Sequence, residues 1–361
     1  MEQKTGTSSN KPLRCIVKLG QFHLSNFPIY FISSHKYLIH TCALLLIITG
    51  GAAITCKNEI EKINEENLEI VSSHLRQSMI LSNFSGNIPG MDWSKSPRDP
   101  QIPDIHIDDF NDESALDLSN FIIVHGAGSF GHFQASRSGV HKGGLNLPIV
   151  KAGFVATRIS VTSLNLEIVR ALAREGIPSI GMSPFAAGWS TCERNISSAD
   201  ISQVINALDS GFVPVLHGDA VMDDLQGCTI LSGDVIIRHL AEKLKPKYVV
   251  FLTDVFGVYD RPPTDPDAIL LREIAVDKDG KWSIIKPTQE DTNKQVEFTV
   301  ADHDTTGGMV TKITEAAMIA KLGIDVYIVK AATSHSLRAL KGEVGDDIPD
   351  DWLGTVIRSS R

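Results

Sequence analysis

The chain has 361 residues, of which 42% are hydrophobic and 21% are charged, a composition typical of a globular protein with a large core. Its formal net charge of −9 argues against a nucleic-acid-binding protein, because such proteins usually carry a basic face. The five cysteines form no Cys-x-x-Cys pair and the N-terminus shows no targeting signal, so we expect no zinc site, no disulfide framework, no membrane partner and a cytoplasmic location.

Hydrophobic periodicity predicts strands that alternate with helices along the chain. The expected strands cover 14–19, 121–124, 177–180, 212–216, 248–252 and 324–329. The expected helices cover 58–80, 154–175, 198–208, 232–245 and 306–321. Turn-forming residues at 223–227 and 277–280 predict hairpins over 221–231 and 275–285. This order predicts an α/β fold with a mostly parallel sheet that helices cover on both faces.

Two stretches look like additions to this α/β core. Residues 82–118 are polar and rich in Pro, Asp, Asn and Ser, which predicts a long surface loop. Residues 260–298 carry the second hairpin and are also expected near the surface.

The most informative motif is His-Gly-Ala-Gly-Ser-Phe-Gly-His at 125–132, directly after the apolar run 121–124. Small residues let backbone N–H groups approach an anion closely, and successive N–H groups in such a loop bind phosphate. The histidine that ends the motif, His132, can donate a hydrogen bond to a second phosphate, although a structural histidine that caps the turn is the alternative. We therefore expect two phosphorylated groups to meet at this loop.

Other glycine-containing segments also lie at strand–helix junctions, at 18–20, 232–234 and 307–308. In open α/β sheets, ligands bind outside the carboxyl ends of the strands, which is where these segments are expected. The chain has no P-loop motif, no Gly-x-Gly-x-x-Gly fingerprint with its acidic partner, and no protein-kinase signature.

Two lysines near these segments suit phosphoryl transfer, which depends on positioning and on cations that stabilise spread negative charge. Lys18 ends a predicted strand and Lys312 lies one turn beyond Gly308. Each also has a structural interpretation, as a strand-end side chain or as part of a solvated helix face. Asp234 is a candidate to hold the ammonium groups, or else a carboxylate favoured by a helix N-terminus.

The chain resembles the amino-acid kinase superfamily and, within it, the isopentenyl phosphate kinases. The segments that carry the resemblance are Gly-Ala-Gly-Ser-Phe-Gly-His at 126–132, Ser-Gly-Asp at 232–234, Leu-Thr-Asp-Val-Phe-Gly-Val-Tyr at 252–259 and Thr-Gly-Gly-Met-x-x-Lys at 306–312. The terminal His132 discriminates between branches, because relatives that phosphorylate a carboxylate lack it. The resemblance covers roughly 13–345 and leaves 1–12 as an expected disordered N-terminus and 346–361 as an expected C-terminal tail.

The resemblance implies an open αβα sandwich, a homodimer, and transfer of a phosphoryl group from ATP with Mg²⁺ to isopentenyl phosphate in isoprenoid biosynthesis. No protein ligand for the metal is expected, since Mg²⁺ would bridge the nucleotide phosphates. The implied catalytic residues are Lys18, Lys57, His132, Asp234 and Lys312. The implied nucleotide-binding residues are Lys18, Gly20, Gly51, Ala52, Gly128, Asp254, Gly308 and Lys312. The implied acceptor-binding residues are Ala127, His132 and Gly233.

The sequence departs from the family at its first motif, Lys-Leu-Gly-Gly-x-x-Ile-Thr-x-Lys, whose halves stand at 18–20 and 51–57. The 30 intervening residues, 21–50, contain one charged residue, Lys36. They are interpreted as an intron translated in frame or a gene-model error, as a membrane anchor, or as a loop excursion. The apolar run 37–49 is shorter than the roughly 20 residues of a spanning helix. Loop closure costs grow slowly with length, so we expect the fold to survive and the activity to be impaired.

Other functions remain open at this stage. One is a kinase for another small acid or monophosphate, although His132 argues against a carboxylate acceptor. Another is a catalytically dead kinase or a membrane-tethered binding protein, which the apolar insertion would explain.

Overall fold

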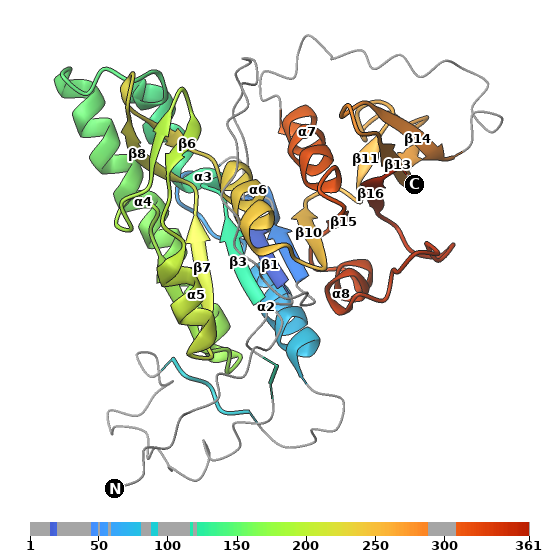
Figure 1. Cartoon of the computed structure of the whole chain (residues 1–361). Helices are drawn as coiled ribbons and strands as arrows, with labels where there is room; N and C mark the ends of the chain where they lie inside the picture. The colour runs from blue at the N-terminus through green and yellow to red at the C-terminus, as the bar shows by residue number, and fades with distance from the viewer. Residues whose placement is uncertain are drawn as a thin grey trace, which may run out of the picture.

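The structure is a computed structural model that describes residues 15–19, 45–49, 51–56, 59–80, 88–92, 116–117, 121–287 and 308–360. The expected disordered N-terminus and most of the expected loop over 82–118 lie outside these residues. Figure 1 shows the described elements arranged around one central sheet.

The elements have the following bounds. The strands are β1 (Cys15–Leu19), β2 (Leu45–Thr49), β3 (Phe121–His125), β4 (Ser179–Met182), β5 (Ser190–Cys192), β6 (Asn195–Ser198), β7 (Val213–His217), β8 (Asp219–Asp223), β9 (Gly227–Leu231), β10 (Tyr248–Thr253), β11 (Val258–Tyr259), β12 (Leu270–Leu271), β13 (Glu273–Val276), β14 (Trp282–Lys286), β15 (Asp325–Lys330) and β16 (Thr355–Ser359). The helices are α1 (Gly51–Ile54), α2 (Glu65–Met79), α3 (Gly128–Ser138), the short η3 (Val140–Lys142), α4 (Pro148–Arg174), α5 (Ser202–Asp209), α6 (Gly233–Leu244), α7 (Gly308–Ala320) and α8 (Ser334–Lys341).

The central sheet has the strand order β14-β13-β16-β15-β10-β1-β3-β7-β4, and β2 pairs with β1. From β15 to β4 all neighbours run parallel, whereas β16 is antiparallel to β15 and β14 is antiparallel to β13. Every residue of β3, β7 and β10 is buried, as is typical of parallel strands that are covered on both faces. The expected mostly parallel sheet is confirmed.

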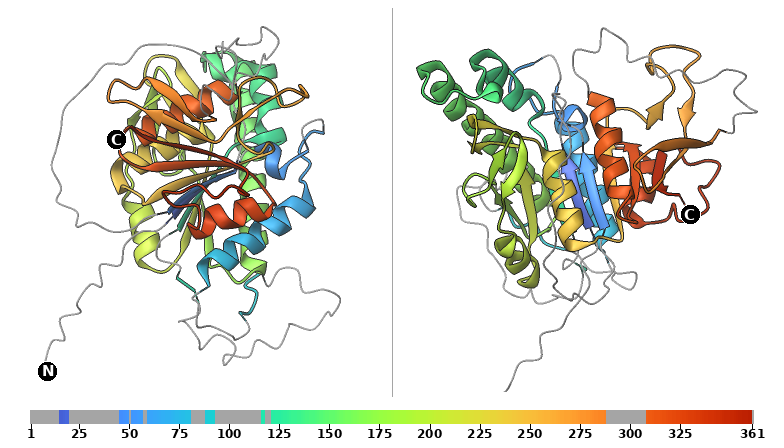
Figure 2. Two further views of the ribbon diagram at one scale, coloured as in Figure 1. Left: turned by 90° about the vertical axis from the view of Figure 1, so that its right-hand side faces the viewer. Right: turned by 45° about the horizontal axis from the view of Figure 1, so that its top comes forward.

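Helices cover both faces of this sheet, so the expected αβα sandwich is confirmed (Figure 2). Side chains of β3 alternate between the two layers: Phe121 and Ile123 pack with α2, α4 and α8, while Ile122 and Val124 pack with α5 and α6. The α7 helix belongs to the second layer. This alternation follows from the two-residue period of a strand.

A smaller sheet of order β6-β5-β8-β9 extends the half of the molecule that carries α3 and α4. The β8–β9 hairpin is the one predicted over 221–231, and the β13–β14 hairpin is the one predicted over 275–285. Val140, Val150 and Phe154 pack with Ala220 and Cys228 to form a separate apolar cluster under this sheet. The small sheet packs on α4 through this cluster, while its Val221 and Leu231 pack with the core of the central sheet.

Three helices begin elsewhere than periodicity predicts, and the one expected from 198 begins at Ser202. The helix expected from 58 begins at Glu65, because the Asn64 side chain accepts a hydrogen bond from the backbone N of Asn67 and caps it. The helix expected from 154 begins at Pro148, a residue that suits the first helical turn. The helices α3 and α8 were not expected at all.

The C-terminal residues 346–361, which were expected to form a tail, contribute β16 to the middle of the sheet. In β16, Val356 and Ile357 are fully buried between β13 and β15. A five-residue strand of this kind is recognisable only from its neighbours, which lie far away in the sequence. The stretch 260–298, expected to be a surface addition, supplies β13 to the same sheet.

Part of the apolar insertion also enters the sheet, since β2 pairs with β1 in parallel. None of the helices in the described part of the chain is long and apolar enough to cross a membrane.

Candidate active site

The sequence motifs meet at the carboxyl ends of the parallel strands, toward the top of Figure 1, where α3, α6 and α7 begin. The Gly-Ala-Gly loop leaves β3 and enters α3, and Ser232 leads from β9 into α6. At the N-terminus of α6, the Ser232 side chain accepts a hydrogen bond from the backbone N of Val235 at 3.3 Å. Free N–H groups and the helix dipole make such N-termini suitable for anions.

The backbones of β3, β7 and α6 approach one another closely at this edge. The backbone N of Gly218 donates to the carbonyl oxygen of His125 at 2.9 Å. A Cβ atom placed on Gly218 would lie 3.3 Å from the backbone N of Gly233. Because glycine occupies these positions, N–H groups rather than side chains border the same space.

Two buried histidines end β3 and β7 and stand in register with each other, with ring centroids 5.5 Å apart. Nδ1 of His125 lies 3.0 Å from the carbonyl oxygen of Gly126, and Nδ1 of His217 lies 3.0 Å from that of Gly218. A carbonyl oxygen only accepts, so each Nδ1 carries the proton and donates. Nε2 of His125 then accepts from the Asn165 side-chain amide at 3.0 Å. These imidazoles hold the loop in place, and the sequence analysis assigned them no role.

His132 differs from these two histidines because it lies one turn inside α3 and is only half-buried. The start of α3 is pressed against α4: a Cβ atom on Gly131 would lie 2.8 Å from both Ala127 Cβ and Val161 Cγ1. The Ser160 hydroxyl of α4 also donates to the carbonyl oxygen of Phe130. The turn that carries His132 is therefore fixed against a 27-residue helix.

The segment that leads to α2 is joined to the first turn of α3. The backbone N of Ser129 donates to the Thr55 hydroxyl at 3.2 Å, and the backbone N of Glu61 donates to the Ser129 carbonyl oxygen at 3.3 Å. Thr55 and Ile63 form an isolated antiparallel bridge. Lys57 itself lies outside the described residues, and Thr55 before it and Glu61 after it are hydrogen-bonded to Ser129 in the first turn of α3.

Asp234 occupies the first turn of α6 and is fully buried. A helix N-terminus favours a carboxylate in this position, and burial strengthens the attraction between that carboxylate and any nearby cation. Gly233 and Asp234 thus lie together in the first turn of α6, and the backbone of Gly233 approaches Gly218.

For the other residues expected in the site, the structure gives the position of the backbone. Lys18 is in register with Val124 of β3, and Gly308 begins the helix that contains Lys312. Gly51 and Ala52 begin α1. Gly20 lies outside the described residues.

The nucleotide side expected around Asp254 follows β10. Asp254 is exposed, and its neighbour Thr253 accepts a hydrogen bond from the backbone N of Ala331 at 2.8 Å through its carbonyl oxygen. Phe256 lies below the Lys330 ammonium group, with Nζ 5.1 Å from the ring centroid. The loops after β10 and β15 are therefore bound together.

A carboxylate that the sequence analysis missed braces the acceptor side. Asp219, fully buried, accepts from Arg158 Nε at 3.3 Å, from the Ser183 hydroxyl at 2.7 Å and from its neighbour's backbone N at 2.9 Å. The Arg158 guanidinium also lies 4.2 Å from the centroid of the Phe185 ring. These partners are 25 to 61 residues apart in sequence, so no local pattern indicated the group.

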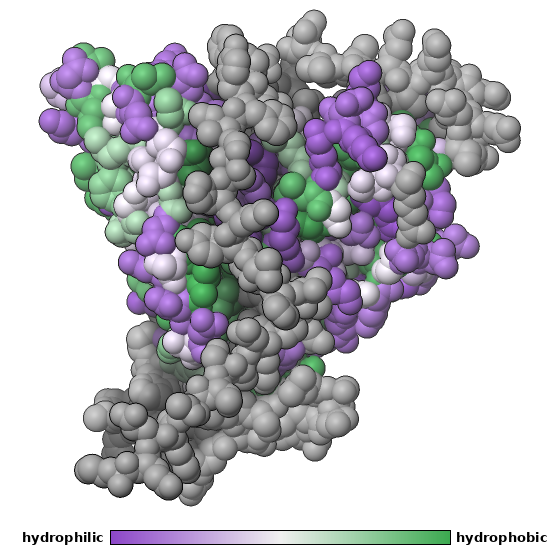
Figure 3. All heavy atoms as spheres, viewed as in Figure 1, coloured by the Kyte–Doolittle hydropathy of each residue, from purple (hydrophilic) through white to green (hydrophobic). Residues whose placement is uncertain are grey.

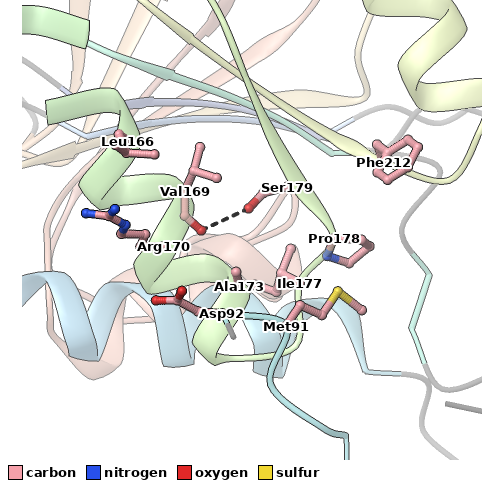
Figure 4. Close-up of a pocket in the computed structure, with 10 residues that line it drawn as sticks. All are labelled: Met91, Asp92, Leu166, Val169, Arg170, Ala173, Ile177, Pro178, Ser179 and Phe212. Atoms are coloured by element: carbon pink, nitrogen blue, oxygen red, sulfur yellow. Dashed lines mark hydrogen bonds between the residues drawn. The ribbon is translucent and has the colours of Figure 1, made fainter. Parts of the chain in front are cut away.

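A hollow of about 440 Å³ lies far from this chemistry (Figure 4). It is bordered by the second half of α4 and by residues at the amino ends of β4 and β7, including Ile177 and Phe212. Since the glycine loop follows the carboxyl ends of the strands, this hollow is a separate feature of the surface. Its lining is mostly apolar, with Leu166 and Val169 on the α4 side.

Comparison with known proteins agrees with this geometry. The sequence profile of the amino acid kinase family matches residues 106–330. The chain is 61% identical to an isopentenyl phosphate kinase of Arabidopsis thaliana over 363 aligned positions, covering 100% of both chains. It is 38% identical to an isopentenyl phosphate kinase of Methanothermobacter thermautotrophicus over 62% of this chain and 82% of that protein. A solved isopentenyl phosphate kinase structure superposes with a TM-score of 0.60 at 30% identity, covering 85% of this chain and 96% of that one.

Proposed function

Because the chain belongs to the amino acid kinase family, and within it to the isopentenyl phosphate kinases, we propose that the site described above transfers the γ-phosphoryl group of ATP to isopentenyl phosphate. The products are isopentenyl diphosphate and ADP, so the reaction belongs to isoprenoid biosynthesis. The observation that supports the assignment of the site is the position of Gly218: its N–H donates to the carbonyl oxygen of His125, where the glycine loop begins, and its backbone approaches the N of Gly233 at the start of α6.

The chemistry requires two phosphates to approach each other. The second pKa of a phosphate monoester is about 6, so at neutral pH the acceptor oxygen is already an anion and attacks the γ-phosphorus without a general base. The γ-phosphoryl group passes to that oxygen, and ADP leaves with the electron pair of the broken bond. The barrier is therefore mainly the repulsion between like charges, which preorganised donors and cations lower.

We assign these donors and cations as follows from the positions of the residues. Ala127 and Gly233 offer backbone N–H groups to the acceptor phosphate, and His132 donates to it from the second turn of α3. Gly128, Asp254 and Gly308 contact the nucleotide. The cations are Lys18, Lys57 and Lys312, which Asp234 orients from the N-terminus of α6.

Mg²⁺ accompanies ATP in this reaction and neutralises charge on the transferring group. Among the residues that the structure describes, no group of three or more His, Cys, Asp or Glu side chains could hold a metal ion. This donor set fits an ion bound through the nucleotide phosphates and water, which is the coordination Mg²⁺ prefers. The protein's own task is to position the two phosphates.

Substitution of His132 by Ala tests the site. We expect kcat/KM for isopentenyl phosphate to fall roughly 100-fold, while the Kd for ATP stays within a factor of about 2, because one preorganised donor to the acceptor phosphate is lost. Release of ADP and calorimetric titration with ATP measure the two quantities. The matched control is His74→Ala, since His74 is a half-buried histidine on α2 that contacts Ser336. Equal activity of the His132 variant and the control contradicts the assignment. Phosphorylation of N-acetylglutamate in preference to isopentenyl phosphate contradicts the acceptor.

We also propose that the protein is a homodimer that pairs through α4. The surface of this helix carries Val155, Ile159 and Leu166, which are 54%, 64% and 48% exposed. Together they span about three turns on one face, and Figure 3 shows hydrophobic residues at the surface where α4 runs, at the upper left. An uncharged face on one long helix is self-complementary when two copies meet about a two-fold axis.

A cytoplasmic location is proposed as well. The described cysteines Cys56, Cys192 and Cys228 are free thiols, which is the usual state of cysteine in a reducing compartment.

A further inference from the structure

The loop that follows β3 presents two backbone N–H groups at the start of α3. Ala127 has a right-handed helical conformation, with φ −69° and ψ −29°, and Gly128 follows in the left-handed region with φ 53°. This pair of conformations turns successive N–H groups toward the same anion. Among the described residues, the N–H of Ser129 has the Thr55 hydroxyl as its acceptor, and that of Phe130 has the Ala127 carbonyl oxygen. The N–H groups of Ala127 and Gly128 are therefore the ones that this loop can offer to a phosphate.

The direction of the Ala127 N–H depends on the trans peptide group that joins Gly126 to Ala127. In a trans peptide, the carbonyl oxygen and the N–H point in opposite directions. The Gly126 carbonyl oxygen accepts from Nδ1 of His125 at 3.0 Å. The His125 side chain lies on the face of the sheet that α4 covers, as does that of Ile123 two residues earlier in β3. The N–H of Ala127 therefore points away from α4, toward the face on which α6 begins with Gly233.

A chain of hydrogen bonds from β7 determines which nitrogen of His125 carries the proton. The Asn165 side chain donates to the Val215 carbonyl oxygen at 3.0 Å, so the nitrogen of this amide, and not its oxygen, faces β7. The same nitrogen donates its second hydrogen to Nε2 of His125 at 3.0 Å. Nε2 is then an acceptor and Nδ1 carries the proton, as the bond to Gly126 requires. Both side chains are buried, where hydrogen bonds are stronger than in water.

We propose that His125 is a positioning residue for phosphoryl transfer, because its Nδ1 sets the plane of the 126–127 peptide group and thereby aims the Ala127 N–H at the acceptor phosphate. His125 is fully buried, so it acts through the Gly126 carbonyl oxygen and not by touching the substrate. The inference rests on the proposed function for the identity of the phosphate, but not for the geometry of the loop.

Two substitutions separate the roles of the two ring nitrogens. In His125→Asn, the side-chain amide can still donate to Gly126 from about the place of Nδ1, but it does not reach Asn165. In His125→Gln, the longer side chain accepts from Asn165 near the place of Nε2, and no donor remains beside the Gly126 carbonyl oxygen. Each variant leaves one buried group without its hydrogen bond, so the two are matched in the stability that they lose.

The two variants are expected to differ in activity with the acceptor. We expect kcat/KM for isopentenyl phosphate to fall about 30-fold in His125→Gln and less than about threefold in His125→Asn, because only the second keeps the N–H of Ala127 in place. KM for ATP is expected to stay within a factor of about 2 in both. Urea unfolding checks that the two stabilities agree. A merely structural role would lower the activity of both variants alike.

NMR measurements on the unsubstituted chain test the geometry even if a variant fails to fold. Long-range proton–nitrogen spectra are expected to show the His125 proton on Nδ1 and none on Nε2. Addition of isopentenyl phosphate is expected to move the Ala127 amide proton downfield, because a hydrogen bond to an anion is short and strong. The control is the amide of Gly139 at the other end of α3, which donates to the Ala135 carbonyl oxygen and should not move.

The outcomes separate this inference from the proposed function. The positioning role is wrong if both variants lose kcat/KM equally, if Nε2 carries the proton, or if the Ala127 amide does not respond to a substrate that the chain phosphorylates. If the unsubstituted chain does not phosphorylate isopentenyl phosphate, the proposed function fails. The tautomer of His125 and the response of the Ala127 amide to inorganic phosphate then still decide whether His125 aims this N–H at an anion.

Discussion

At the scale of single residues, the buried carboxylate of Asp219 stabilises the half of the molecule that carries α4. Asp219 joins β8 to α4 through Arg158 and to the loop after β4 through Ser183, and it directly follows Gly218, whose backbone approaches Gly233. A buried carboxylate with this many donors is costly to disturb, because the guanidinium that it neutralises is partly buried as well.

Asp219→Asn is therefore expected to lower the free energy of unfolding by about 3 kcal/mol, since it leaves Arg158 without its charge partner. Urea titration followed by tryptophan fluorescence measures this change. Because the β7–β8 turn borders the acceptor site, KM for isopentenyl phosphate should rise more than KM for ATP. Asp267→Asn, at an exposed carboxylate, is the matched control. If the free energy of unfolding falls no more than in the control, the Asp219 network does not stabilise the fold.

At the scale of elements, the N-terminus and the body of α6 lie in different surroundings. Its N-terminus carries Gly233 and Asp234, and its body packs Ile236, Ile237 and Leu240 against the sheet. A polar residue of α6, His239, lies within this apolar packing. His239 lies edge-on to Trp189 at 5.8 Å between ring centroids, and its Nε2 has no hydrogen-bond partner among the described residues.

Burial, together with the smaller effect of the nearby Lys243 ammonium, lowers the pKa of His239 from 6.5 to about 4. Because the folded state binds this proton less readily than the unfolded chain, the group has no effect above pH 6.5 and destabilises the fold as the pH falls from 6.5 toward 4. The expected loss between pH 7.5 and pH 5 is about 2 kcal/mol.

His239→Leu should remove this share of the pH dependence. Chemical unfolding of both proteins at the two pH values measures it, and the difference between the slopes isolates His239 from the other histidines. Identical slopes would mean that His239 titrates normally in the folded protein.

At the scale of the whole molecule, the apolar face of α4 is open at one side of the sandwich and runs toward the hollow of Figure 4, which shares Leu166 with it. Ile159→Glu is expected to convert the proposed dimer to a monomer, because two charges would be buried near the two-fold axis. Light scattering coupled to gel filtration measures the mass. Ile149→Glu is the control, an equally exposed isoleucine on the same helix about a third of a turn off the face. A monomeric unsubstituted chain, or dissociation by both substitutions alike, contradicts the α4 interface.

Local patterns alone determined the buried strands β3, β10 and β15 and both hairpins, because strand burial and turn chemistry are written in consecutive residues. They also predicted a phosphate-binding loop at 125–132 and its place at the end of a strand. The branch of the family followed from the position of His132 in that motif.

Tertiary structure decided which residues far apart in the sequence pair or contact one another. It placed β16 between β13 and β15 instead of leaving 346–361 as a tail, and it joined Asp219 to Arg158 across 61 positions. It also paired β2, which lies within the apolar insertion, with β1 in parallel. Short strands and buried ion pairs gain their stability from partners far along the chain, so no window of the sequence contains the interaction that selects them.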